Sequence, residues 1–252
     1  MVGVAWHRGE WARVAAPPFA YAALVWMVRP LQHRTTRPIP KLRVSYNVLM
    51  STYSFLVAAM VFLKLMHNRR LDSAHELLCR ASPGIPVGWY ESKVLEWTDT
   101  LFILLRGRWP SSLHLRHHAT AASVVALNIV GRKAPTPLFD VGTLLNAAVR
   151  TRFRVYSLAS QCLSPWQVHA GMYAYYANPT GLARFRRAIT AAQIVQHVLM
   201  VVAILAALAA PTDACDAPTV PYLVSLLMFS VWVAEFVHFY LTDTTGTRAK
   251  VE

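Results

Sequence analysis

The sequence predicts an all-α, polytopic membrane protein whose single domain takes up residues 1–252 and crosses the bilayer seven times. Of its 252 residues, 55% are hydrophobic and only 15% are charged, a balance typical of polytopic membrane proteins and unlike that of soluble domains. Apolar stretches also recur along the whole length, so no second, soluble domain fits. These stretches occupy residues 14–28, 45–65, 87–105, 113–130, 138–149, 189–210 and 222–241.

Each stretch has its own character. The first contains Pro17 and Pro18 and leads straight into a basic loop, which is unlike a cleavable signal peptide. The second, sixth and seventh approach the ~20 apolar residues that span hydrocarbon. The third surrounds a run of ionisable residues, the fourth opens with three histidines, and the fifth is short and interrupted.

The net charge of +13 is distributed between the apolar stretches and does not form one patch. This alternation excludes nucleic-acid binding as the reason for the charge. Basic residues favour the first, third and fifth loops and the tail, so the positive-inside rule predicts a lumenal N-terminus and a cytosolic C-terminus. Arg248 and Lys250 resemble the dibasic retrieval signals of endoplasmic-reticulum membrane proteins.

The third stretch carries Lys93, Glu96, Asp99 and Thr100 at spacings of three and four, within two turns of one predicted helix. Unpaired ions cost several kcal/mol in a membrane interior, so we expect these groups to pair with one another or with a neighbouring helix. The alternative is that the run is the solvated cytosolic end of a helix.

The fourth stretch opens with His114, His117 and His118, whose i, i+3, i+4 spacing places three imidazoles on one helical face. A neutral imidazole can act as a nucleophile or a base near neutral pH. Two alternatives are an interfacial cluster with no role and a di-iron site of the desaturase or hydroxylase kind. The other seven histidines are solitary, so the ligand count falls short and no metal is predicted. The three cysteines have irregular spacing and predict neither disulfides nor a zinc site.

Two further clusters follow. His169, Met172, Tyr173 and Tyr176 share a helical face, a pattern that packing or an interfacial aromatic belt also produces. Residues 190–196 hold Thr190, Gln193 and Gln196 at spacings of three, which is typical of amides that join helices in membranes.

These four motifs, Lys-x-x-Glu-x-x-Asp-Thr, His-x-x-His-His, His-x-x-Met-Tyr-x-Tyr-Tyr and Thr-x-x-Gln-x-x-Gln, stand in the order that the ELO family has. The chain resembles these very-long-chain fatty acid elongases of the endoplasmic reticulum from Tyr46 and Asn47 to the tail. The resemblance implies seven spans, the last six of which surround an acyl-chain tunnel. It also implies an acyltransferase that condenses malonyl-CoA with a long-chain acyl-CoA, giving 3-oxoacyl-CoA, CO2 and CoA. Neither a metal nor a redox cofactor takes part.

The resemblance assigns roles to individual residues. His117 would attack the thioester and carry the acyl group, with His169 facing it from the next helix. His114 and His118 would orient and tune His117, while Glu96 and Asp99 would fix imidazole tautomers or pair with Lys93. The residues implied to line the tunnel are Met172, Tyr173, Tyr175, Tyr176, Thr190, Gln193 and Gln196. Charge alone suggests the groups that would meet the CoA phosphates, namely Arg106, Arg108, Arg184, Arg186 and Arg187. The expected partners are a ketoacyl-CoA reductase, a dehydratase and an enoyl reductase.

Residues 149–168 depart from the family pattern. In the family, an Asn lies four residues before the histidine of the third motif, whereas Asn146 here is separated from His169 by a segment with Arg150, Arg152 and Arg154. Removing residues 149–167 restores the family run. We interpret the segment as an insertion that interrupts the fifth span, and the hypothesis for its origin is a retained intron. The alternative is a genuine loop or re-entrant excursion.

Two other functions fit the composition less well. A di-iron desaturase or hydroxylase would need further histidine boxes. A seven-span receptor or transporter has no need for three clustered histidines beside a Lys/Glu/Asp run.

Overall fold

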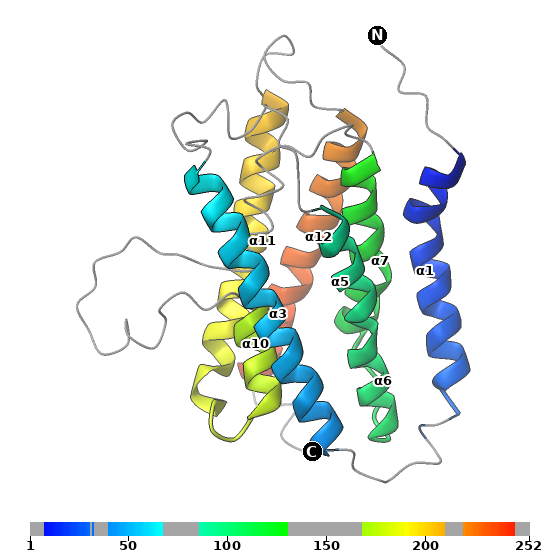
Figure 1. Cartoon of the computed structure of the whole chain (residues 1–252), viewed down its shortest axis with the longest axis vertical. Coiled ribbons are helices and arrows are strands. Elements are labelled where there is room, and N and C mark those ends of the chain that lie inside the picture. Colours follow the sequence, from blue (N-terminus) through cyan, green and yellow to red (C-terminus); the bar gives the residue numbers. More distant parts are fainter. Residues whose placement is uncertain are drawn as a thin grey trace, which may run out of the picture.

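The computed structural model of the chain describes residues 8–30, 32, 40–67, 86–130, 168–209 and 219–244. Within these residues it is all-helical and has no strand, which confirms the all-α prediction for this part of the chain. The helices run side by side along the long axis of the molecule and form a bundle (Figure 1).

The helices coincide with six of the seven predicted stretches. In chain order they are α1 (Arg8–Val28), α3 (Pro40–His67), α5 (Pro86–Leu95), α6 (Trp97–Leu105), α7 (Ser112–Val130), α10 (Val168–Ala177), α11 (Arg186–Ala209) and α12 (Thr219–Thr244). A short 3₁₀ turn, Ala183–Phe185, precedes α11. The predicted fifth stretch, Asn146 and the insertion up to residue 167 lie outside the described residues, and α10 begins at the last residue of that predicted insertion.

The third predicted stretch is two helices, and the expectation of one continuous helix there was wrong. Glu96 separates α5 from α6 with φ −60° and ψ −17°, close to the 3₁₀ conformation. The backbone N–H of Asp99 donates to the carbonyl of Glu96 at 3.1 Å, a bond of 3₁₀ spacing that tightens the turn. The chain continues in nearly the same direction, so the ionisable side chains of the two helices still lie close together.

Helix α7 packs against α1 on one side and α12 on the other, while α3 packs against α10 and α11 against α12. Small residues on α7 permit its close approach to α12, as is common between membrane helices. Ala121 and Val124 of α7 form one buried cluster with Trp232 and Phe236 of α12.

The outer faces of the bundle carry large apolar side chains. Phe19 and Trp26 on α1 are 76% and 74% exposed, and similar residues line α3, α11 and α12. Soluble monomers rarely expose apolar surface on this scale. Among the described residues, two helical stretches are long and apolar enough to cross a membrane, Ala183–Ala209 and Thr219–Thr242, and a shorter apolar helix covers Ala12–Val28.

Candidate active site

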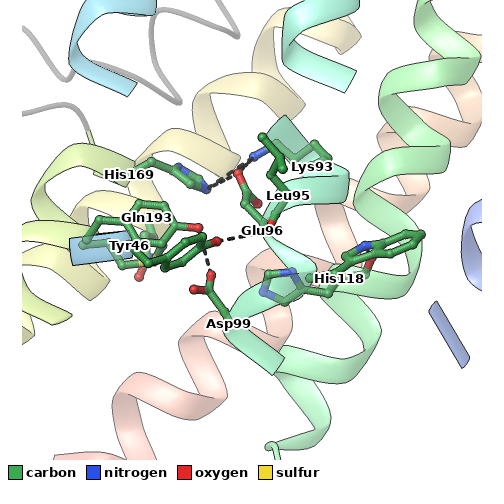
Figure 2. A network of polar contacts seen from close by, with 11 residues as sticks. Tyr46, Lys93, Leu95, Glu96, Asp99, His118, His169 and Gln193 are labelled. Carbon is green, nitrogen blue, oxygen red and sulfur yellow. Dashed lines mark hydrogen bonds and ion pairs between the residues drawn. The ribbon is translucent and has the colours of Figure 1, made fainter. Parts of the chain in front are cut away.

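The first three sequence motifs and Gln193 of the fourth meet inside the bundle. Six of these side chains are directed toward a common region in Figure 2, namely Lys93, Glu96, Asp99, His118, His169 and Gln193. They belong to five helices and to the turn between α5 and α6. Lys93, Glu96, His118 and His169 are all buried. The fold therefore gathers residues that are separated by up to 100 positions in the sequence.

Lys93, Glu96 and His169 form a compact ionic contact. The Lys93 ammonium donates to Oε1 of Glu96 at 2.6 Å, as expected for ions in an apolar environment. Nε2 of His169 lies 3.4 Å from Nζ of Lys93 and 3.8 Å from Oε1 of Glu96. Because an ammonium group has only donors, Nε2 of His169 accepts from Lys93, which places the imidazole proton on Nδ1. The contact thus fixes both the position and the tautomer of His169.

Asp99 binds a different partner. The Tyr173 hydroxyl donates to Oδ2 of Asp99 at 2.8 Å, so a neutral donor from α10 holds the second carboxylate. The ring of Tyr46 on α3 packs edge-on against Tyr173, with a centroid distance of 6.1 Å. The Tyr46 hydroxyl in turn donates to the carbonyl of Leu95 at 3.0 Å, beside the turn at Glu96 (Figure 2).

Two of the three clustered histidines, His114 and His118, contact residues of α1 and α6. Nε2 of His114 lies 2.8 Å from Oγ1 of Thr100, and the same hydroxyl shares a 2.8 Å hydrogen bond with the hydroxyl of Tyr21. The His114 and His118 rings lie against each other with centroids 4.1 Å apart and an interplanar angle of 38°. Trp97 donates from Nε1 to the backbone carbonyl of His118 at 3.0 Å. His114 is thereby oriented by a hydroxyl chain that begins on α1.

His117 has a separate environment. Its ring lies 5.0 Å from the ring of Trp232 and 6.2 Å from that of Phe236, both on α12, and 6.4 Å from that of His197 on α11. The resemblance led us to expect His169 opposite His117. In the structure, His169 contacts Lys93, Glu96 and Tyr173. Two other imidazoles pack against His117, that of His118 at a centroid distance of 5.5 Å and that of His197 at 6.4 Å.

The residues expected to line a tunnel lie on α10 and α11. Gln193 donates from Nε2 to the sulfur of Met172 at 3.5 Å, which joins the two helices. Gln196 is 4% exposed, and its buried Oε1 accepts no hydrogen bond within the described residues. The remaining members are Tyr173, Tyr175 and Tyr176, which form a chain of packed rings, and Thr190, whose hydroxyl donates to the Arg186 carbonyl.

The end of α6 and the starts of α7 and α11 lie at the same end of the bundle (Figure 1). The five arginines expected to meet CoA are exposed there, namely Arg106, Arg108, Arg184, Arg186 and Arg187. The guanidinium of Arg187 lies 5.5 Å from the Tyr240 ring centroid, which links the start of α11 to the end of α12.

Sequence analysis missed five residues of this region: Tyr21, Tyr46, Trp97, His197 and Trp232. Most belong to no motif and could be found only by knowing which helices are neighbours. His197 had a usable signal, because it follows Gln196 directly and lies four residues after Gln193, on the same helix. Among the described residues, no group of three or more His, Cys, Asp or Glu side chains is arranged to hold a metal ion.

A model of the GNS1/SUR4 family, abbreviated ELO, matches residues 7–166 and 139–251 of the chain. The chain belongs to this family. The family prediction made from the four ordered motifs is therefore confirmed. The match consists of two segments that overlap at residues 139–166. The first segment ends and the second begins in the region where the sequence departs from the family pattern.

A curated relative is "Fatty acid elongase 2" of Trypanosoma cruzi (strain CL Brener), which is 35% identical over 118 residues. The aligned region makes up 40% of this chain and 42% of the relative, so the chain covers less than half of that protein.

Proposed function

We propose that this ELO-family protein is a condensing enzyme of fatty acid elongation, a 3-oxoacyl-CoA synthase. It would join malonyl-CoA to a long-chain acyl-CoA and release CO2 and CoA. The observation that carries the proposal is the buried contact of Lys93 with Glu96 and His169, next to three clustered histidines. Ionisable groups buried in an apolar bundle are costly and are retained mainly where they have a function.

The proposed chemistry divides between two groups of side chains. His117 attacks the thioester carbonyl, and an acyl-imidazole forms while the CoA thiolate leaves. His169, held in one tautomer by Lys93 and Glu96, serves as the second imidazole of the condensation. His114 and His118 help to hold His117 in position, because Thr100 hydrogen-bonds to His114 and Trp97 hydrogen-bonds to the carbonyl of His118. The proposed reaction needs no metal or redox cofactor.

We further propose that the protein spans the endoplasmic-reticulum membrane seven times, with the C-terminus in the cytosol and six helices around an acyl tunnel. The clustering of arginines at one end of the bundle supports a cytosolic entrance for the CoA groups (Figure 1). The residues of α10 and α11 named above would line the tunnel. A reductase, a dehydratase and an enoyl reductase would complete the cycle.

The test is malonyl-CoA-dependent elongation in microsomes, with the chain as given, the chain lacking residues 149–167, and His117→Ala in each. The matched control is His238→Ala, because His238 is an exposed histidine on α12. We expect labelled malonyl-CoA to be incorporated into longer acyl chains, with loss of activity in His117→Ala alone. Absence of product from both backgrounds, across acyl-CoA substrates of many lengths, would refute the proposal.

A further inference from the structure

His197 is a buried imidazole that none of the four motifs includes. It lies on α11, is 4% exposed, and packs against the ring of His117 at a centroid distance of 6.4 Å and an interplanar angle of 81°. A histidine in an apolar helix is uncommon, and one that lies beside the proposed nucleophile needs an explanation.

The tautomer of His197 is fixed by its own helix. Nδ1 lies 2.6 Å from the backbone carbonyl of Gln193, which is an acceptor only. Nδ1 must therefore carry the proton, and in a neutral ring Nε2 then carries the lone pair. In this tautomer, His197 can accept a proton at Nε2.

Helix α12 holds the two imidazoles in place. Trp232 contacts both rings, at 5.0 Å from His117 and 5.7 Å from His197. Phe236 stacks on His197 at 5.1 Å and meets His117 edge-on at 6.2 Å. Phe229 packs on the other side of His197 at 5.8 Å. This aromatic cluster restricts the motion of both rings.

We propose that His197 is a positioning partner of His117 that takes up its proton during acyl transfer, an inference that rests on the proposed function. As one ring nitrogen of His117 forms a C–N bond with the thioester carbon, the C–S bond breaks and its electron pair leaves on the CoA sulfur. The proton on the other ring nitrogen of His117 passes to Nε2 of His197. When the malonyl-derived carbanion, formed with loss of CO2, displaces the acyl group, His197 returns that proton to His117.

The separation of the rings is compatible with this transfer. An in-line hydrogen bond between two imidazoles puts their centroids roughly 5–5.5 Å apart, so the rings must approach by about 1 Å. Catalytic hydrogen bonds are often long in the free enzyme and tighten when substrate binds.

The test uses two measurements on the full chain in detergent. One is steady-state elongation with malonyl-CoA. The other is the rate at which diethyl pyrocarbonate modifies His117, read by peptide mass spectrometry with His114 of the same molecule as internal reference. His197→Phe keeps an aromatic ring in the cluster and removes both nitrogens. His238→Phe is the matched control on α12.

We expect His197→Phe to lower kcat about tenfold or more with KM for acyl-CoA unchanged. We also expect it to slow modification of His117 severalfold relative to His114, while His238→Phe changes neither. Equal modification of His117 in wild type and His197→Phe would overturn the inference, whatever the elongation assay shows. A wild type that makes no product would instead refute the proposed function. If His197→Phe fails to fold, His197→Gln, which can accept a hydrogen bond but not a proton, gives the same comparison.

Discussion

Tyr173 of α10 donates its hydroxyl hydrogen to Oδ2 of Asp99 on α6 across 2.8 Å. This bond joins the first sequence motif to the third, and it complements the contact of Lys93 with His169 between the same two regions. Tyr173 is fully buried, whereas Asp99 is half-buried, so the tyrosine hydroxyl depends on this bond more than the carboxyl group does. The Tyr173–Asp99 bond is therefore a point at which stability can be measured without disturbing the histidine box.

Tyr173→Phe should lower the free energy of unfolding by about 0.5–1.5 kcal/mol, because it removes one hydrogen bond to the half-buried carboxyl group of Asp99. Thermal unfolding of the purified protein in detergent measures the loss. Tyr175→Phe, a neighbouring tyrosine on the same helix, is the control and should lose much less. Equal losses in the two variants would show that the bond from Tyr173 to Asp99 makes no specific contribution to stability.

Thr100→Val should reduce elongation activity, because it removes the hydroxyl that links His114 to Tyr21 while preserving side-chain volume. We expect kcat to fall roughly tenfold, the scale of a lost hydrogen bond that orients a working imidazole. Thr100→Ser retains the hydroxyl and should keep most of the activity. Full activity in Thr100→Val would mean that the chain from α1 does not orient the box.

Arg116 and Glu235 pair across α7 and α12, and their burial is unequal: the Arg116 side chain is 59% exposed and that of Glu235 14%. Removing the arginine leaves the mostly buried carboxylate of Glu235 without its partner, whereas removing the glutamate leaves the exposed Arg116 in contact with solvent. Arg116→Ala should therefore destabilise by several kcal/mol, up to the roughly 3–5 seen for buried charges, and Glu235→Gln by about 1 kcal/mol or less.

The double variant Arg116→Ala/Glu235→Gln should recover most of the stability lost in Arg116→Ala, as a thermal double-mutant cycle can measure. Additive losses would show that the two residues stabilise the helices independently.

Sequencing of the transcript tests the retained-intron hypothesis for residues 149–167. The expected result is a spliced mRNA that lacks these codons and encodes residues 148 and 168 side by side. The break in the family match at residues 139–166 supports this expectation. Transcripts that uniformly carry the codons would rule the hypothesis out, and the segment would then be a genuine loop.

The sequence was sufficient to predict the helical class, the approximate bounds of six apolar stretches and the family. Spacing placed His114, His117 and His118 on one face, because helical periodicity is a local property. The prediction of one continuous helix was wrong at Glu96, where a backbone hydrogen bond of 3₁₀ spacing divides the third stretch into two helices.

Partners across helices were harder to predict. Nothing local to Tyr21, Trp232 or His197 indicates that they lie near the box, since that depends on which helices become neighbours. The pairing of Lys93 with Glu96 was predictable because the two ions are three residues apart and so lie in adjacent turns. That Tyr173 donates to Asp99 could not be predicted, because the two residues lie on different helices.

Helix α7 is enclosed by the first and the last described helices, since Tyr21 of α1 stacks near His118 and Trp232 of α12 covers His117. This arrangement has a consequence for biosynthesis. A ribosome makes α1 and α7 well before α12, so in the nascent chain the three clustered histidines are open on one side until α12 is inserted. The Lys93–Glu96 pair can form earlier, because both residues lie in adjacent turns. The aromatic side of the site is therefore complete only after α12 is in place, and a chain that lacks α12 holds His117 without the ring of Trp232.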